Sequence, residues 1–208
     1  MDAKSELRRY TSLPALLRVL RQRAITLLPT DSWDDQNDRE LMKAYAGATK
    51  SKTCLALCFA QAFETYHHWK VFSAGSDGVC IVFKKDELIL RAEAEKVRHG
   101  PVKYMTLEEI REEQPKLIDL PFSKRTAYKD EKEYRLIFDS PNDIHTSKDI
   151  PITPDIIKRV LINPWMPDPL YESTKETIQA IAGFENTKVT QSSVRNATDW
   201  RELAKKYA

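Results

Sequence analysis

The sequence contains little glycine and no long apolar run. Only 5 of its 208 residues are glycine, and it has no Walker loop, no glycine-rich dinucleotide fingerprint and no nucleophile elbow. No apolar run approaches the roughly 18 residues that a membrane span needs. The first ten residues, MDAKSELRRY, lack the apolar core of a signal peptide. We therefore expect neither a P-loop enzyme nor a membrane protein, and a cytoplasmic location.

Cysteine is scarce, and charge of neither sign dominates. The 3 cysteines have no framework spacing, which indicates reduced thiols rather than disulfides. The formal net charge is +2, so no global electric field recruits nucleic acid. Charged residues make up 31% and hydrophobic residues 41% of the chain, which is typical of a globular protein with a charge-rich surface.

Helices and short strands alternate along the chain. The strongest strand signals are the apolar run Thr53–Ala60 and the β-branched run Val79–Phe83. Ser12 is a typical helix N-cap, and Thr106 opens a capping box that predicts a helix to about Leu117. This pattern predicts an α+β protein with a mixed, mostly antiparallel sheet and flanking helices.

The same pattern sets the expected domain organisation. The length allows one well-filled core, so we expect a single domain over residues 1–208. Residues 163–208 are a possible C-terminal accessory segment. We also expect one strand over Gly100–Tyr104, and a loop over the polar, proline-bearing segment Ser140–Pro151.

The segment Lys129–Phe138, KDEKEYRLIF, is the best candidate for a site. Interpreted as a strand, it places Glu131, Glu133 and Arg135 on one face. Two carboxylates and a guanidinium stand there in place of small or apolar groups, which is typical of a functional site. The alternative is an exposed sheet edge with cross-strand ion pairs to lysines, and the residues alone favour that alternative.

Two further groups could bind a metal ion, and both have a simpler interpretation. His67 and His68 point to different faces of a helix, and the spacing of Cys54 and Cys58 is wrong for zinc. The acidic loop after Pro29 could hold a divalent cation, but such loops are more often solvated caps, and Asp34 or Asp35 is a suitable N-cap for the helix that follows. We predict no metal site.

Three blocks of residues resemble a known family. They are Arg9-Tyr10 followed by Trp33-Asp34-Asp35; Cys58-Phe59, Trp69 and Gly78-Val79-Cys80; and Glu131 to Leu136. In this order they resemble a bacterial family known as domain of unknown function 2971, over roughly two thirds of the chain. The sequence departs from the family pattern at four positions: Asp34 replaces Asn, Gln36 replaces Pro, and Val71 and Phe72 replace His and Tyr.

The layout of that family is in turn similar to the ADP-ribosyltransferase fold. This resemblance implies NAD as substrate, with Glu133 stabilising the ribose and Glu131 orienting the acceptor or taking its proton. It implies that Arg9 holds the pyrophosphate and Tyr10 stacks on a base or nicotinamide ring. The predicted nucleotide-binding residues are Arg9, Tyr10, Trp69 and Arg135. The polar residue of the second strand has no counterpart, because Leu28 and Pro29 occupy that region.

The resemblance predicts an enzyme that uses NAD to modify a protein or nucleic-acid acceptor, as a bacterial toxin, effector or phage-defence component. The basic clusters Arg18–Arg23 and Lys124–Lys132 could receive such an acceptor, or could be ordinary lysine-rich surface. Two alternatives stay open. One is a non-catalytic nucleotide- or protein-binding module, and the other is a metal-dependent nuclease built on the acidic loop with Glu131 and Glu133.

Overall fold

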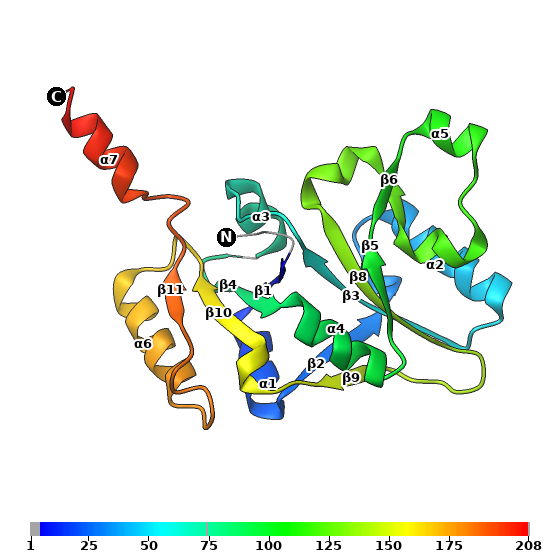
Figure 1. Cartoon of the computed structure of the whole chain (residues 1–208), viewed down its shortest axis with the longest axis horizontal. Coiled ribbons are helices and arrows are strands. Elements are labelled where there is room, and N and C mark those ends of the chain that lie inside the picture. Colours follow the sequence, from blue (N-terminus) through cyan, green and yellow to red (C-terminus); the bar gives the residue numbers. More distant parts are fainter. Residues whose placement is uncertain (1–4, 74, 208) are drawn as a thin grey trace. The chain divides into compact units, whose positions relative to one another are not determined.

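The computed structural model describes residues 5–73 and 75–207. Their contacts divide the chain into two compact units. Unit 1 contains Met1–Arg23, Phe63–Lys84 and Thr153–Ala208, and unit 2 contains Ala24–Ala62 and Lys85–Ile152. The chain therefore passes repeatedly from one unit to the other, as the colours of Figure 1 show.

Unit 1 is built on strands in the order β11-β10-β4-β1. β4 pairs antiparallel with both β1 and β10, and β11 joins β10 in parallel. The β-branched sequence of β4 explains its position, since Gly78 to Phe83 are all buried. The elements of unit 1 are β1 (Glu6–Ser12), α1 (Leu13–Gln22), α3 (Tyr66–Phe72), β4 (Gly78–Lys84), η5 (Pro154–Ile156), β10 (Ile157–Ile162), α6 (Asp168–Gln179), β11 (Val189–Gln191) and α7 (Thr198–Lys205).

Unit 2 is built on an antiparallel sheet in the order β5-β8-β3-β2-β9. β3 and β8 pair along their full length, from Thr53 opposite Ser140 to Ala60 opposite Glu133. β6 and β7 form a separate parallel pair. The elements of unit 2 are β2 (Ala24–Pro29), η2 (Thr30–Ser32), α2 (Gln36–Thr49), β3 (Thr53–Ala60), α4 (Lys85–Ala94), β5 (Arg98–Pro101), β6 (Lys103–Met105), α5 (Leu107–Glu112), η3 (Leu117–Phe122), β7 (Ser123–Arg125), η4 (Thr126–Glu131), β8 (Glu133–Ser140) and β9 (Lys148–Pro151).

The strongest local signals in the sequence give the elements they predict. The α+β class with a mostly antiparallel sheet is confirmed. The Ser12 side chain accepts a hydrogen bond from the Ala15 N–H at the start of α1. At Thr106 both hydrogen bonds of the capping box form, as predicted. The single domain over 1–208 and the accessory segment 163–208 stay predictions.

Three predicted element boundaries are wrong. The helix after Thr106 ends at Glu112 instead of about Leu117, because Pro115 disfavours helical backbone in the residue before it. Two strands, β5 and β6, replace the single strand Gly100–Tyr104, because β5 pairs with β8 whereas β6 pairs with β7.

The third is the predicted loop Ser140–Pro151, whose last four residues form β9. Its Ile150 is fully buried and lies opposite Ile25 of β2. A single apolar residue among polar neighbours gives no periodic signal, so only tertiary pairing reveals this strand.

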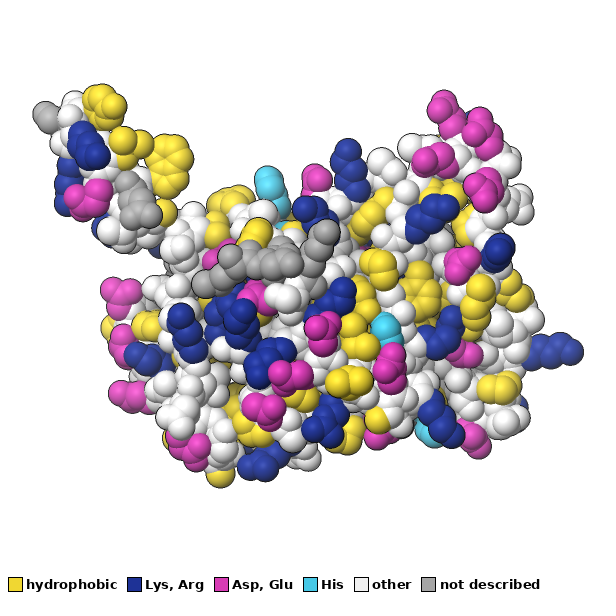
Figure 2. Space-filling view, viewed as in Figure 1, with side chains coloured by type: hydrophobic (Ala, Val, Ile, Leu, Met, Phe, Trp, Pro, Cys, Tyr) yellow, Lys and Arg dark blue, Asp and Glu magenta, His cyan; other side chains and the backbone are white. Residues whose placement is uncertain are grey.

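Basic and acidic side chains are interspersed on the face shown in Figure 2, in keeping with the small net charge. Within residues 5–73 and 75–207, no helix is both long enough and apolar enough to cross a membrane.

Candidate functional site

The candidate site lies where η4 leads into β8, and the strand starts later than the sequence predicts. β8 begins at Glu133. Glu131 is the last residue of the 3-10 helix η4, and Lys132, with a left-handed φ of 44°, turns the chain into the strand. The prediction that Glu131 shares a strand face with Glu133 and Arg135 is therefore wrong. The run Lys129–Lys132 has no apolar or β-branched side chain whose burial would extend the strand.

Glu133 and Arg135 do share one face of β8 and form a buried ion pair. The Arg135 guanidinium donates to both carboxylate oxygens of Glu133, from Nε at 2.7 Å and from Nη2 at 3.0 Å. It also donates to Asp38 Oδ2 at 2.7 Å and to the Pro121 carbonyl at 2.9 Å. The ring of Trp33 lies 4.9 Å from the guanidinium carbon. Arg135 is 1% exposed, so these contacts replace its hydration.

A lysine joins the three carboxylates of this region. Lys124 Nζ lies 2.7 Å from Glu131, 3.0 Å from Glu133 and 3.5 Å from Asp38. Asp38 comes from α2 and Lys124 from β7. We call Asp38, Lys124, Glu131, Glu133 and Arg135 the carboxylate cluster, and all five residues belong to unit 2.

The cluster holds three carboxylates against two permanent cations, and the two glutamates respond in opposite ways. Burial raises the pKa of Glu133, but Arg135 and Lys124 outweigh burial and bring its pKa to about 2. Burial raises the pKa of Glu131, Lys124 lowers it, and the neighbouring Glu133 adds to the rise. The net shift of the Glu131 pKa is upward. Glu133 is therefore ionised at neutral pH, and Glu131 exchanges a proton more readily.

The other sequence-predicted residues lie in unit 1. Tyr10 is 6% exposed and packs edge-on against Trp69, with ring centroids 5.2 Å apart. Trp69 is buried, and its indole N–H donates to Glu64 at 3.0 Å. Arg9 directly precedes Tyr10 on β1, so its side chain points to the opposite face of the strand. The nucleotide-binding roles of these residues stay predictions.

Sequence reasoning overlooked three charged residues. Asp38 and Lys124 belong to the acidic loop and the basic cluster noted above, but nothing in the sequence pairs them with each other. The third is Arg8, which is 1% exposed and contacts Glu6. The Glu6 carboxylate also forms ion pairs with Arg159 Nη2 at 3.0 Å and with Lys158 Nζ at 2.7 Å. In the described part of the chain Arg8 Nη1 has no hydrogen-bond partner. The signal that could have identified Arg8 is the two-residue spacing of Glu6, Arg8 and Tyr10, which places all three on one face of a strand.

Metal ligation finds no support among residues 5–73 and 75–207, where no three His, Cys, Asp or Glu side chains are placed to hold an ion. The central position of the carboxylate cluster is taken by the ammonium group of Lys124. In the acidic loop, Asp35 caps α2 by accepting a hydrogen bond from the Asn37 N–H at 2.9 Å. The predicted capping role of that loop is confirmed for Asp35.

A family model matches the segment that carries these motifs. The model, described as "Protein of unknown function (DUF2971)", covers residues 68–136. That segment contains Trp69, Gly78-Val79-Cys80 and Glu131 to Leu136, so the predicted resemblance is confirmed there. It spans about a third of the chain rather than two thirds. No curated protein matches the sequence.

Among solved structures, the chain is similar to DarT of Thermus sp. 2.9 in three complexes. The complex with ADP-ribosylated single-stranded DNA has 10% sequence identity and a TM-score of 0.46, and the match covers 91% of this chain and 94% of DarT. The complex with carba-NAD+ has 9% identity and a TM-score of 0.45, and the complex with NAD+ has 10% identity and a TM-score of 0.46. Each of these two matches covers 91% of this chain and 96% of DarT. At these low identities the likeness does not assign a function to this chain.

Proposed function

We propose that the protein is an ADP-ribosyltransferase that uses NAD to modify a protein or nucleic-acid acceptor. The resemblance of the sequence layout to the ADP-ribosyltransferase fold supports this proposal. The observation that carries the proposal is the shared contact of Glu131 and Glu133 with Lys124, at 2.7 and 3.0 Å. Two neighbouring carboxylates whose pKa values move in opposite directions suit a reaction that needs one fixed anion and one base.

The reaction breaks the bond between the ribose C1′ carbon of NAD and the nicotinamide ring nitrogen. Nicotinamide leaves with the bonding electron pair, and the ribose becomes oxocarbenium-like. A nucleophile of the acceptor then bonds to C1′ and gives its proton to a base. A fixed carboxylate stabilises the positive charge on the ribose, as in glycoside hydrolysis. In this proposal Glu133 is the fixed carboxylate and Glu131 is the base.

The carboxylate cluster already stabilises one cation in the way that the proposal requires. The Lys124 ammonium contacts all three carboxylates, and an oxocarbenium-like ribose is also a cation. Glu133 is held by Arg135 through two hydrogen bonds, so its oxygens are fixed before the reaction starts. Pre-oriented charge of this kind stabilises a transition state without reorganisation at the moment of reaction.

The test is nicotinamide release from NAD, measured by chromatography with purified protein. We expect the wild type to release nicotinamide and Glu133→Gln to be slower by on the order of 100-fold, because the fixed charge is lost. Glu131→Gln should lower the rate in the presence of an acceptor and flatten its pH profile. Glu40→Gln is the matched control, since Glu40 is an exposed residue of α2 that pairs only weakly with Lys43 at 3.4 Å.

Each variant must show a cooperative thermal transition, so that a loss of turnover is not a loss of folding. Equal rates for the wild type and Glu133→Gln would overturn the assignment of Glu133. An absence of both NAD binding and nicotinamide release would overturn the proposal itself.

A second candidate function is a non-catalytic nucleotide- or protein-binding module. The observation that favours it is the completeness of the ion pairing around Arg135, which is 1% exposed and bonded to Glu133, Asp38 and the Pro121 carbonyl. Fully satisfied buried networks also occur as purely structural features. Saturable NAD binding without nicotinamide release, unchanged in Glu133→Gln, is the result that would select this candidate.

A further inference from the structure

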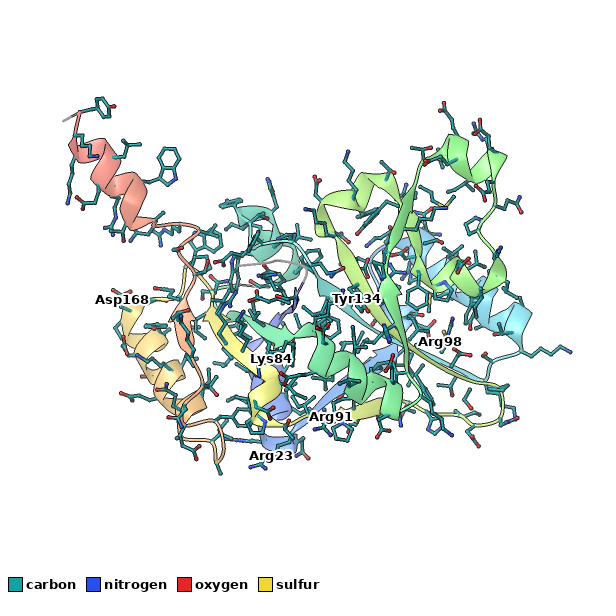
Figure 3. All side chains as sticks on the ribbon, viewed as in Figure 1. Arg23, Lys84, Arg91, Arg98, Tyr134 and Asp168 are labelled. Atoms are coloured by element: carbon teal, nitrogen blue, oxygen red, sulfur yellow. The ribbon has the colours of Figure 1, made fainter. Side chains whose placement is uncertain are left out.

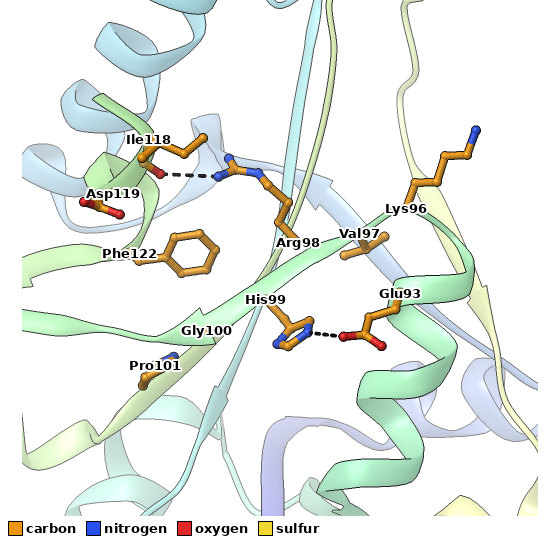
Figure 4. A pocket seen from close by; sticks show the side chains of 10 residues that line it. All are labelled: Glu93, Lys96, Val97, Arg98, His99, Gly100, Pro101, Ile118, Asp119 and Phe122. Atoms are coloured by element: carbon orange, nitrogen blue, oxygen red, sulfur yellow. Dashed lines mark hydrogen bonds and ion pairs between the residues drawn. The ribbon is translucent and has the colours of Figure 1, made fainter. Parts of the chain in front are cut away.

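Unit 2 contains an open pocket of about 670 Å³ that is separate from the carboxylate cluster. This volume falls within the range of about 300–1,000 Å³ that is usual for ligand sites. The pocket is lined by residues of α4, β5 and η3 and of the turn between α4 and β5, shown in Figure 4. None of the site residues that the sequence predicts lines this pocket.

The pocket follows the outer edge of β5. Lys96 to Pro101 line it without interruption, so side chains from both faces of the strand border the same space. Among the described strands, β5 pairs only with β8. The Val102 N–H donates to the Glu133 carbonyl at 2.9 Å. In an antiparallel pair every second residue bonds to the neighbouring strand, so this bond shows which backbone groups of β5 face β8. The backbone of Gly100 therefore faces β8, and the N–H and C=O of His99 point outward.

One wall of the pocket is apolar and is held in place by Arg98. The guanidinium of Arg98 donates to the Ile118 carbonyl at 3.3 Å and lies 5.6 Å from the centre of the Phe122 ring. Gly100 faces the same ring, and a Cβ at Gly100 would make ordinary contact with it at 3.4 Å. The Phe122 ring therefore already packs over Gly100, with room for no more than a methyl group between them.

The side of the pocket around His99 carries the Glu93 carboxylate, and Lys96 also borders the pocket. His99 lies between Glu93 and Tyr134, with its Nε2 3.1 Å from the Glu93 carboxylate and its Nδ1 2.7 Å from the Tyr134 hydroxyl. Arg98 and Tyr134 lie on the neighbouring strands β5 and β8 (Figure 3). The Glu93 side chain is 56% exposed, so it can still receive a cationic group. The Arg98 charge is already offset by Asp139 at 3.3 Å.

We propose that the outer edge of β5 binds an extended peptide as an additional strand, with a basic residue opposite His99 and apolar residues on either side. The peptide residue opposite His99 exchanges two backbone hydrogen bonds with it and directs its side chain toward Glu93. Its neighbours point to the other face, where one packs against the Phe122 ring beside Gly100. Pro101 offers a carbonyl but no N–H, which limits the peptide to few hydrogen bonds and predicts micromolar rather than nanomolar binding.

The test is fluorescence anisotropy of a labelled peptide, Thr-Val-Lys-Val-Thr, with blocked ends, titrated with the full chain. We expect saturable binding that is lost when the central lysine of the peptide is N-methylated, because the donor to the His99 carbonyl is then absent. Gly100→Leu should weaken binding at least tenfold, because the added side chain would displace the Phe122 ring that the peptide side chain contacts. Gly47→Ala is the matched control, because nothing lies within 4 Å of the added methyl group.

Charge reversal gives an independent test. Glu93→Lys should weaken binding of the lysine peptide and strengthen binding of the same peptide with a central glutamate. Equal affinity for the N-methylated peptide, or an unchanged affinity in Gly100→Leu that folds normally, would overturn the proposal. Neither result bears on nicotinamide release, so this inference and the proposed function can fail separately.

Discussion

Glu133 shows how one buried side chain depends on partners from several elements. Its carboxylate receives Arg135 from its own strand and Lys124 from β7. These two cations overcome the cost of burial and leave the Glu133 pKa at about 2. Removing one partner of such a network leaves the remaining charges unpaired in a poorly solvated site. The resulting loss of folding stability is typically larger than the net stabilisation that the whole network provides.

We expect Glu133→Gln to be destabilised in a pH-dependent way. A carboxylate with a lowered folded-state pKa contributes stability that is present above its unfolded pKa and is lost as the pH falls through the folded value. With a shift from 4.5 to about 2, the deficit of the variant should be on the order of 3 kcal/mol at about pH 7. It should shrink between about pH 4.5 and pH 2. Urea denaturation of both proteins across this pH range measures the deficit.

The control for this prediction is Glu40→Gln, whose exposed ion pair should contribute little at any pH. A deficit for Glu133→Gln that stays constant from neutral to acidic pH would contradict the prediction. It would mean that packing of the side chain, rather than its charge, holds this position together.

At the scale of elements, α2 shows how a helix positions a site residue. Asp35 caps its first turn, and the buried residues Asp38, Met42 and Tyr45 follow at the spacing of one helix face. Packing of Met42 and Tyr45 therefore fixes where Asp38 meets Arg135. Gly47 lies on the exposed face of the same helix, where glycine adds flexibility to the unfolded chain and makes no close contact.

We expect Gly47→Ala to raise the free energy of unfolding by about 0.5–1 kcal/mol, because alanine loses less backbone entropy on folding. Thermal denaturation should show a higher melting temperature with no change in nicotinamide release. Gly183→Ala provides the opposite case. Gly183 has a φ of +88°, and a Cβ there would lie 3.0 Å from the Arg23 guanidinium, so this variant should be destabilised. Equal changes in melting temperature in Gly47→Ala and Gly183→Ala would contradict both predictions.

At the scale of the whole molecule, neither unit is a continuous stretch of chain. The central strand of unit 1, β4, follows all of β2, α2 and β3 of unit 2. In unit 2, β3 meets its partner β8 only after more than 70 further residues, as the pair Ala60 and Glu133 shows. Most strand pairing in the protein is therefore long-range, which delays its formation during folding.

We expect a fragment of residues 1–62 to remain unfolded, because it lacks both β4 and β8. Circular dichroism should show no cooperative thermal transition. Deletion of residues 198–208 is the contrasting change, since Trp200 and Tyr207 of this end are 73% and 86% exposed. Figure 2 shows hydrophobic side chains exposed in the region of α7, the helix at the upper left of Figure 1. This deletion should leave the melting temperature almost unchanged, and a large decrease would show that α7 contributes to packing.

Elements whose signals lie within a few residues follow from the amino-acid sequence alone. The apolar run of β3, the β-branched run of β4 and the caps at Ser12 and Thr106 are local features, and each gave the expected element. The sequence also identified Glu133 and Arg135 as the centre of an unusual polar strand. Local backbone preferences and a two-residue period suffice for these conclusions.

The groups that surround that centre are brought together by long-range folding. Arg135 and Asp38 are 97 positions apart in the sequence, and no period or spacing connects residues so distant. Glu131 joins the cluster from a 3-10 helix rather than from the strand, and Lys124 reaches it from β7. The edge of β5 likewise depends on which strands remain unpaired. These features arise from long-range packing, which places side chains together without leaving a pattern in the order of the residues.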